Sequence, residues 1–331
     1  MNKIGVIGSG IWGTALALTA VRANNEVLCW ARNRDIVDDI NINHKNEKYL
    51  PNVDLPLSIK ATTYIKDIFD FAKVILLTVS AQHTREIMVN IKPFVKNDTI
   101  IVICAKGIEA NSGKMLSEVA EEILPNTKIA ILSGPGFAID VAMKRFVSVT
   151  IASTDATIAE NLTKMLGTPY FRPYMTTDII SPQIGGSIKN VIAIASGIVE
   201  GAKFGDGARA ALITRGFHEM SKLSKGLGGE LTTMMGMCGL GDLVMTASCM
   251  QSRNFSFGYD VGVKGDATSV IRENTKTVEG LFTTKAVVKR ALELEIEMPI
   301  CEMINRLLFE GVSLKDAMNE LLCRPYKGEG I

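Results

Sequence analysis

The sequence predicts an α/β domain with a doubly wound parallel sheet over residues 1–180, followed by an all-helical domain over residues 181–331. Three observations lead to this prediction. A glycine-rich turn joins a strand to a helix at the start of the chain. Continuous apolar runs of strand length then alternate with helical stretches, which is typical of a parallel sheet covered on both faces. Beyond Ser181, strand-like runs largely disappear and helical patterns take over.

The first element is an apolar run at Lys3–Ile7 that predicts a buried strand and ends in Gly8-x-Gly10-x-x-Gly13. Gly8 allows a tight exit from the strand, Gly10 lets a pyrophosphate approach the backbone, and Gly13 lets the following helix pack against the sheet. The start of that helix offers unpaired N–H groups to phosphates. The turn therefore predicts a dinucleotide site, and an ordinary strand-to-helix turn is the alternative.

Further apolar runs predict the other strands and order them along the chain. A helix is expected at Ala81–Lys92 and an irregular segment at His44–Thr63. Ligands of such sheets bind beyond the carboxyl ends of the strands, where Ser80, Lys106 and Gly134 fall. The predicted strands are Glu26–Trp30, Ala72–Ser80, Thr99–Cys104, Lys128–Leu132 and Phe146–Ile151.

The second half of the chain predicts helices after a boundary near Asp178–Ser181. A mostly apolar helix is expected to begin at Ser187, and Leu321–Ile331 is expected to form a loose tail. Later helices are predicted at Arg209–Ser224, Thr283–Leu294 and Ile300–Glu310.

Composition limits the class of protein. The 331 residues are 47% hydrophobic and 21% charged with a net charge of +1, which gives no reason to expect nucleic-acid or membrane-surface binding. No apolar run approaches the length of a membrane span, and because the first strand follows the start of the sequence at once we expect no leader peptide. The six cysteines are scattered and none has zinc-like spacing, so we expect free thiols, no metal site and a cytoplasmic location.

The end of the second predicted strand bears on the choice of cofactor. Sites that prefer NAD place an acidic residue here to bind the ribose hydroxyls. This chain has Arg32 and Arg34, whose guanidinium groups suit a 2′-phosphate, with Asp35 close behind. NADPH is therefore the preferred expectation and NADH remains open. Two solvated loop arginines are the alternative.

The best acid–base candidate is Lys189. It lies in an apolar helical run beside Asn190, where desolvation would lower its pKa. A lysine whose ammonium reaches solvent is the alternative. The three histidines, at positions 44, 83 and 218, make weaker candidates.

Three polar clusters complete the candidates. Gly236–Leu243 delivers one carboxylate, Asp242, which could instead cap a helix. Ser252–Asn254 groups the donors that a phosphate monoester needs, and a surface turn is its alternative. Val278–Gly280 could cap a helix or bind a ligand.

Together these motifs resemble the bacterial NAD(P)-dependent glycerol-3-phosphate dehydrogenases over nearly the whole chain. The ordered set carries the resemblance, since each motif alone is common. The motifs are Gly8-x-Gly10-x-Trp12-Gly13-Thr14-Ala15-Leu16-Ala17, Lys106-Gly107, Ser133-Gly134-Pro135 with Phe137-Ala138, Lys189-Asn190, Ala210-Ala211-Leu212-x-Thr214-Arg215-Gly216, Gly239-x-Gly241-Asp242-Leu243, Ser252-Arg253-Asn254 and Val278-Glu279-Gly280.

The resemblance implies a Rossmann domain, a helical substrate domain and a homodimer. It implies that hydride passes from NADPH or NADH to the carbonyl carbon of dihydroxyacetone phosphate. The product is sn-glycerol 3-phosphate for glycerophospholipid synthesis, with Lys189 as proton donor and acceptor. Lys106 is expected to face the substrate and to lower the Lys189 pKa by like-charge repulsion.

The resemblance also assigns the binding residues. After Gly134-Pro135 the family usually has Ser or Thr, but this chain has Gly136, which puts a side-chain contact there in doubt. Substrate contacts are expected at Lys106, Gly134, Gly136, Lys189, Asp242, Ser252, Arg253 and Asn254. Cofactor contacts are expected at Gly8, Gly10, Ile11, Trp12, Gly13, Arg32, Lys106, Ala138, Arg253, Thr277 and Glu279.

Two other functions compete with this one. A dehydrogenase of the ketopantoate or hydroxyisobutyrate type also pairs a dinucleotide domain with a helical domain and a catalytic lysine. The cluster Ser252–Asn254 with Asp242 argues against it, because these groups suit phosphate and hydroxyl rather than carboxylate alone. A non-catalytic dinucleotide sensor is the second alternative, but a sensor needs neither Lys106 nor Lys189.

Overall fold

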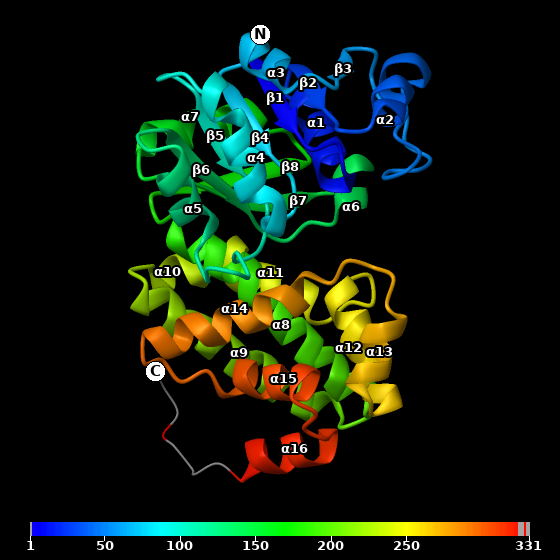
Figure 1. Ribbon diagram of the computed structural model, residues 1–331, viewed down its shortest axis with the longest axis vertical. Coiled ribbons are helices and arrows are strands. Elements are labelled where there is room, and N and C mark those ends of the chain that lie inside the picture. The colour runs from blue at the N-terminus through cyan, green and yellow to red at the C-terminus, as the bar shows by residue number, and fades with distance from the viewer. Residues whose placement is uncertain (1, 324–327, 329–331) are drawn as a thin grey trace. The chain divides into compact units, whose positions relative to one another are not determined.

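A computed structural model of the protein describes residues 2–323 and 328 and divides the chain into two units (Figure 1). The sheet unit comprises Met1–Ala105 and Leu116–Pro182, and the helical unit comprises Lys106–Met115 and Gln183–Ile331. Sequence reasoning assigns Lys106–Met115 to the first domain, whereas this segment belongs to the helical unit.

The sheet unit contains an eight-stranded sheet among the described residues, in the order β3-β2-β1-β4-β5-β6-β7-β8. Strand order reverses beside β1, as in doubly wound sheets, so the predicted fold class is confirmed. The strands are β1 (Lys3–Ile7), β2 (Glu26–Trp30), β3 (Ile59–Thr62), β4 (Val74–Leu77), β5 (Ile100–Ile103), β6 (Lys128–Ser133), β7 (Val147–Ala152) and β8 (Phe171–Thr176).

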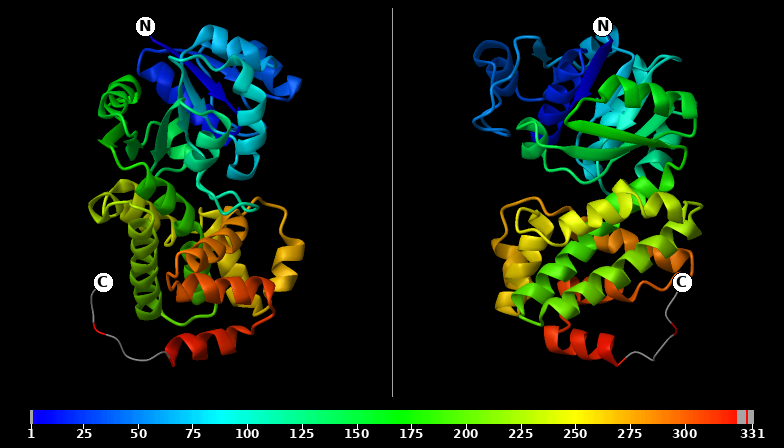
Figure 2. Two further views of the ribbon diagram at one scale, coloured as in Figure 1. Left: turned by 60° about the vertical axis from the view of Figure 1, so that its left-hand side comes forward. Right: turned by 180° about the vertical axis from the view of Figure 1, so that it is seen from behind.

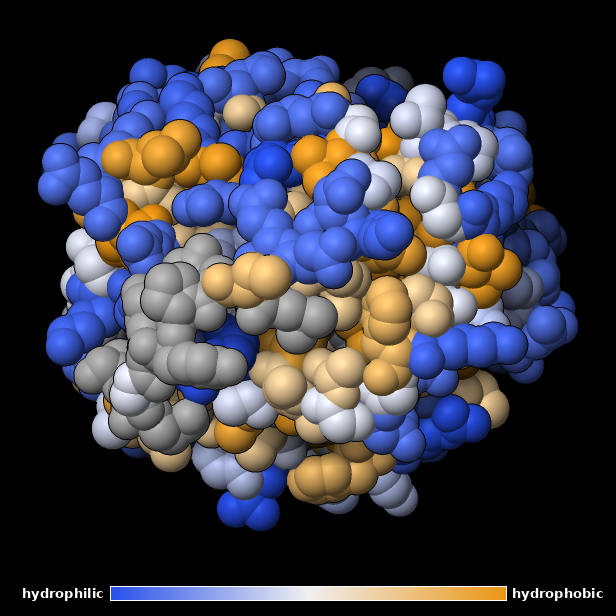
Figure 3. Space-filling view, turned by 90° about the horizontal axis from the view of Figure 1, so that it is seen from below, coloured by the Kyte–Doolittle hydropathy of each residue, from blue (hydrophilic) through white to orange (hydrophobic). Residues whose placement is uncertain are grey.

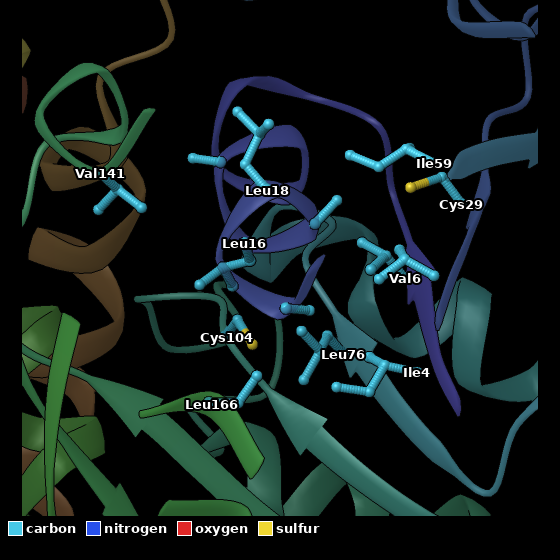
Figure 4. Packing of buried hydrophobic residues seen from close by; sticks show 14 of the residues in the cluster. Ile4, Val6, Leu16, Leu18, Cys29, Ile59, Leu76, Cys104, Val141 and Leu166 are labelled. Atoms are coloured by element: carbon cyan, nitrogen blue, oxygen red, sulfur yellow. The ribbon is translucent and has the colours of Figure 1, made fainter. Parts of the chain in front are cut away.

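Both faces of the sheet are buried, because alternate residues of the central strands enter two separate cores. Ile4 and Val6 enter a core with helices α1 (Ile11–Arg22), α2 (Arg34–Asp38), α6 (Ala138–Ala142) and α7 (Ala156–Leu166); Figure 4 shows part of it. Ile7 enters the opposite core. That core is formed with α3 (Ile65–Phe71), α4 (Thr84–Ile91) and α5 (Leu116–Ile123). Burial on both faces explains why the strands read as continuous apolar runs.

Two features of the sheet differ from the sequence prediction. Strand β7 runs antiparallel to β6, whereas a wholly parallel sheet is expected from the sequence. An apolar run carries no information on strand direction, which depends on how the connection returns. Strand β8, which pairs in parallel with β7, is absent from the prediction because Pro173 and exposed residues interrupt its apolar pattern.

The segment His44–Thr63 is more ordered than expected. It ends in edge strand β3, which pairs with β2. Leu50, Val53 and Leu55 are buried in the core that contains α1. Because Pro51 and Pro56 interrupt the segment, its apolar stretches are too short to show a periodic pattern, and the sequence does not predict this packing.

The helical unit, which Figure 2 shows in two further views, is organised around α8 (Ile180–Gly201). This helix is buried along nearly all of its length. This helix begins seven residues before the predicted start at Ser187. Asp178 accepts hydrogen bonds from the N–H groups of Ile180 and Ser181, and Pro182 falls in the first turn, where its missing N–H costs nothing.

Several other helices of this unit contact α8, among them those that carry Gly216, Gly258 and Gly280. Three predicted helices are confirmed with small changes at their ends, namely α9, α14 and α15. The bounds are α9 (Asp206–Gly226), α10 (Leu231–Met234), α11 (Asp242–Thr246), α12 (Arg253–Lys264), α13 (Ala267–Glu273), α14 (Glu279–Glu293), α15 (Pro299–Phe309) and α16 (Leu314–Leu322).

The predicted tail begins within α16, which extends to Leu322. Residues 324–327 and 329–331 of that tail lie outside the described residues. In the part of the chain that the structure describes, no helix is long and apolar enough to cross a membrane. On the face shown in Figure 3, hydrophilic side chains alternate with smaller hydrophobic patches.

Candidate active site

Lys189 projects from α8 into the interior of the helical unit. Its side chain is 6% exposed, which excludes the alternative of an ammonium that reaches solvent. Nζ donates a hydrogen bond to Oδ1 of Asp242 and another, 2.8 Å long, to Oγ1 of Thr246. A buried ammonium is tolerated only with partners of this kind.

Asp242 joins two lysines through its two carboxylate oxygens. Its Oδ2 accepts a 2.7 Å hydrogen bond from Nζ of Lys106, while Oδ1 binds Lys189. Asp242 is fully buried and Lys106 is 19% exposed. The side chain of Asp242 does not cap the helix that it begins, so the capping alternative is wrong. One carboxylate thus holds two ammonium groups together in a largely dry site.

The surroundings of Lys189 change its acidity. The pKa of its ammonium is lowered to about 7: burial is the largest cause, the Asp242 carboxylate opposes it by raising the pKa, and Lys106 acts with burial to lower it. Like-charge repulsion from Lys106 therefore acts in the expected direction, but burial is the larger cause. A group with a pKa near neutrality can both give and take a proton at physiological pH.

The cluster Ser252–Asn254 lies at the start of α12 rather than in a surface turn. Ser252 is the N-cap, and its Oγ accepts a hydrogen bond from the N–H of Phe255. Arg253 is exposed at the first helical position. The free N–H groups of the first turn and this guanidinium make the helix start suitable for an anion.

The carboxamide of Asn254 makes contacts within the protein. Nδ2 donates to Oδ1 of Asn190 on α8 and Oδ1 accepts from the N–H of Gly280 on α14, both at 2.9 Å. Asn190 and Asn254 are buried. The expected substrate contact at Asn254 is thus limited to its backbone and its second amide hydrogen, because the side chain links three helices.

The predicted cofactor residues of the helical unit lie at the start of α14. Thr277 is exposed in the preceding loop and Glu279 is the first residue of the helix. Oε2 of Glu279 is buried and has no hydrogen-bond partner among the described residues. Burial raises the pKa of Glu279, and Arg253 opposes that shift. An unpaired buried carboxylate oxygen indicates a site that a ligand completes.

The glycine turn has the form expected of a dinucleotide site. Gly8 has a φ of +108°, and a Cβ at Gly13 would lie 1.8 Å from the carbonyl oxygen of Gly8, so both positions require glycine. A Cβ at Gly10 would meet nothing within 4 Å, which leaves open space beside the start of α1. No side chain caps that helix. Its first N–H groups are available to a phosphate.

Two side chains beside the turn are also candidates. Ile11 is 45% exposed at the first position of α1. Trp12 packs against the core, and its buried Nε1 has no hydrogen-bond partner among the described residues. Both side chains belong to the expected cofactor set, and the unpaired indole nitrogen offers a donor to a bound group.

The remaining predicted residues of the sheet unit follow strand ends. Gly134 and Gly136 come after β6, and Ala138 begins α6. A Cβ at Gly136 would lie 2.8 Å from Cγ1 of Val147, so the space for a Ser or Thr side chain is occupied by Val147. Arg32 is exposed after β2. Arg34 instead forms an ion pair with Asp38.

Sequence reasoning missed Thr246, which contacts Lys189 directly. The available signal was its spacing from Asp242, since residues four apart share one face of a helix. Asn190 appeared only as the neighbour of Lys189, without a role of its own. Its hydrogen bond with Asn254 joins residues 64 positions apart, so no local pattern reveals it.

Comparisons with known proteins cover both units. Residues 3–159 match the family described as NAD-dependent glycerol-3-phosphate dehydrogenase N-terminus, and residues 178–319 match the C-terminus of the same family. A glycerol-3-phosphate dehydrogenase, NAD(P)+, of Rhodospirillum rubrum is 44% identical over 330 residues, which are 100% of this chain and 95% of the relative.

Two further relatives agree. A protein of the same name from Maricaulis maris is 45% identical over 325 residues, covering 98% of this chain and 97% of the relative. The crystal structure of glycerol-3-phosphate dehydrogenase from Coxiella burnetii has a TM-score of 0.91 at 36% identity. The match covers 98% of this chain and 99% of the Coxiella burnetii chain. The similarity extends over nearly the full length of each protein.

Proposed function

The chain belongs to the NAD-dependent glycerol-3-phosphate dehydrogenase family, and from this we propose that it reduces dihydroxyacetone phosphate to sn-glycerol 3-phosphate with NADPH or NADH. The observation that carries the proposal is the buried Lys189 ammonium, held beside Asp242 and Lys106 with a pKa near 7. The resemblance inferred from the sequence motifs is confirmed at the level of the family.

The residues of the sheet unit fit a dinucleotide cofactor. The open space at Gly10 and the uncapped start of α1 suit a pyrophosphate, and the unpaired Nε1 of Trp12 offers a further donor. In the helical unit, the unpaired oxygen of Glu279 suits a hydroxyl or amide of the cofactor. A bound nicotinamide supplies the hydride for reduction.

Lys189 is proposed as the general acid that protonates the carbonyl oxygen during reduction and removes the same proton in reverse. Its desolvated ammonium, with a pKa of about 7, is a much stronger acid than a lysine in water. Asp242 and Thr246 hold Nζ by two hydrogen bonds, so the transferable proton is held in one place. General acid catalysis of this kind contributes about 10²- to 10⁴-fold.

Arg253 and the start of α12 are proposed to bind the substrate phosphate. The free N–H groups of the first turn and the guanidinium supply charge and directed donors. Lys106 is proposed to contact both substrate and cofactor. Phosphate binding at a distance from the carbonyl would orient the reacting atoms, and its binding energy would lower the barrier.

NADPH is proposed as the preferred cofactor. Arg32 supports this preference because it is exposed at the carboxyl end of β2, whereas Arg34 pairs with Asp38 through Nε. A guanidinium binds a 2′-phosphate better than it binds a ribose hydroxyl.

We further propose that the protein is a cytoplasmic homodimer that supplies the backbone of glycerophospholipids. Residues 1–180 would supply most of the cofactor contacts and residues 181–331 most of the substrate contacts. Four of its cysteines are buried as free thiols, which supports a reducing compartment. Sedimentation equilibrium should give twice the mass of one chain.

The proposal is tested by following oxidation of NADPH, and in parallel NADH, with dihydroxyacetone phosphate as substrate. We expect turnover with both cofactors, and Lys189→Ala should lower it about 100-fold or more while NADPH affinity stays the same. Lys225→Ala, which removes an exposed lysine from α9, is the matched control. Near-normal turnover in Lys189→Ala would overturn the role of this lysine. Activity with a branched keto acid, and none with dihydroxyacetone phosphate, would overturn the substrate.

A further inference from the structure

Asn46 contacts the glycine turn from a distant part of the sequence. It lies in the segment between β2 and β3 and is 1% exposed. Its Nδ2 donates a 2.9 Å hydrogen bond to the carbonyl oxygen of Ser9 and a 2.8 Å hydrogen bond to Oγ1 of Thr14. One carboxamide therefore binds the turn on both sides of Gly10-Ile11-Trp12-Gly13, the stretch that faces the proposed phosphate site.

The neighbouring bonds determine how this carboxamide is oriented. Oγ1 of Thr14 donates its only hydrogen to the carbonyl oxygen of Gly10 at 2.9 Å, so toward Asn46 it can only accept. The carbonyl oxygen of Ser9 can also only accept. Both partners require the NH₂ group of Asn46, and the reverse orientation of the amide would place oxygen against oxygen.

The segment that carries Asn46 is itself well anchored. The main-chain oxygen of Asn46 accepts hydrogen bonds from the N–H groups of Tyr49 and Leu50, and Leu50 is buried in the core. Oδ1 of Asn46, in contrast, is buried without a hydrogen-bond partner among the described residues. A buried oxygen without a hydrogen-bond partner lowers the stability of the fold. The stabilising contribution of the Asn46 side chain therefore comes from the two hydrogen bonds that its NH₂ group donates.

We propose that Asn46 is a positioning residue for the dinucleotide phosphate site. It holds Ser9 and Thr14 at fixed places before cofactor arrives, so that the N–H groups at the start of α1 already point toward the pyrophosphate. A turn ordered in advance loses less conformational freedom on binding, and this raises affinity. The inference rests only on the dinucleotide-binding part of the proposed function.

The test compares Asn46→Ala with a matched variant from the same segment, Asn41→Ala. The carboxamide of Asn41 likewise makes two hydrogen bonds, but to Ala61 of edge strand β3: Nδ2 donates to the carbonyl oxygen and Oδ1 accepts from the N–H, both at 2.9 Å. Each variant therefore loses two hydrogen bonds, although Asn46 donates both of its bonds and Asn41 donates one and accepts one. Of the two residues, only Asn46 contacts the turn. Asn46→Leu, which keeps the number and branching of the side-chain heavy atoms, serves if the alanine variant does not fold.

Three measurements are made on the full chain. Fluorescence titration gives the NADPH dissociation constant, hydrogen exchange of the free protein reports on residues 8–16, and steady-state kinetics separates KM from kcat. We expect Asn46→Ala to raise the dissociation constant and the NADPH KM about tenfold or more, because two bonds to the turn are lost. Exchange at residues 8–16 should quicken, while kcat at saturating NADPH stays the same. Asn41→Ala should leave all of these unchanged.

Equal dissociation constants for Asn46→Ala and Asn41→Ala would overturn the positioning role, as would wild-type exchange rates at residues 8–16 in Asn46→Ala. Failure of the wild type to bind either NADPH or NADH would overturn the cofactor part of the proposed function. Binding that depends on Asn46 in a protein inactive on dihydroxyacetone phosphate would support the positioning role and reject the substrate.

Discussion

At the scale of single residues, the balance of charge around Asp242 decides how Lys189 behaves. Two ammonium groups share one carboxylate, and these three charged groups sit in a site that excludes most water. Asp242 raises the Lys189 pKa and Lys106 lowers it, while burial provides the largest decrease. Asp242 and Lys106 therefore shift the pKa of Lys189 in opposite directions, and each of the two can be substituted separately.

This opposition predicts opposite changes in the pH dependence of reduction. The acid must be protonated, so kcat/KM falls as pH rises through the Lys189 pKa. Asp242→Asn removes the group that raises this pKa, so the fall should begin at lower pH. Lys106→Met removes a group that lowers it, so the fall should begin at higher pH. Each displacement is expected to be on the order of one pH unit or more.

The measurement is kcat/KM for dihydroxyacetone phosphate between pH 5 and 9 with saturating NADPH. Only the pH at which kcat/KM declines is compared, so a loss of substrate affinity in either variant does not affect the result. Lys225→Ala should retain the wild-type profile. Displacement of both variants in the same direction would contradict the assignment of Lys189 as the titrating acid.

At the scale of elements, a close crossing of α8 and α12 places the phosphate cluster relative to Lys189. Gly197 and Gly201 on α8 face the backbone of α12, and Gly258 and Gly262 on α12 face that of α8. A Cβ at Gly258 would lie 2.0 Å from the carbonyl oxygen of Ile194. The two backbones are in direct contact, so the crossing tolerates no side chain there.

Gly258→Ala should force these helices apart. We expect the free energy of unfolding to fall by about 2 kcal/mol or more, as in overpacked cores, and the KM for dihydroxyacetone phosphate to rise because Arg253 moves relative to Lys189. The control is Gly207→Ala on α9, where a Cβ meets nothing within 4 Å. It should leave stability unchanged or raise it by up to ~1 kcal/mol. Urea denaturation measures the stability of both variants, and equal stabilities of Gly258→Ala and Gly207→Ala would contradict the role of the crossing.

At the scale of the whole molecule, the chain does not divide into its two units at a single point. Lys106–Met115 follows β5 of the sheet unit but belongs to the helical unit. Lys106 therefore meets Asp242 and Lys189 within one unit, although 136 residues separate Lys106 from Asp242. The charged cluster is complete in the helical unit alone.

Ligands should therefore protect the chain in a pattern that does not follow sequence order. In hydrogen exchange, glycerol 3-phosphate is expected to slow residues 106–115 together with residues 236–254, because Lys106 and Asp242 belong to one charged cluster and respond to one substrate. NADPH alone should slow residues 8–16. Protection of residues 106–115 by NADPH alone, with no added effect of glycerol 3-phosphate, would contradict this assignment.

Much of this protein can be derived from sequence because the determining interactions are local. The glycine turn, the strands β1, β2, β4, β5 and β6 and the change to helices near Ser181 follow from periodicity and from residues only a few positions apart. The candidacy of Lys189 also follows locally, since a lysine in an apolar helical run is costly to bury without a purpose.

Tertiary structure decided what depends on distant partners. It shows that Lys106 and Lys189 both bind Asp242 and that Thr246 is a further partner of Lys189. It also shows that the Asn254 side chain binds within the protein and that β7 runs antiparallel to β6. It also ordered the segment of Asn46 against the glycine turn. The physical reason is the same throughout: composition and spacing determine which face of an element is buried, but not which of many polar groups it meets there.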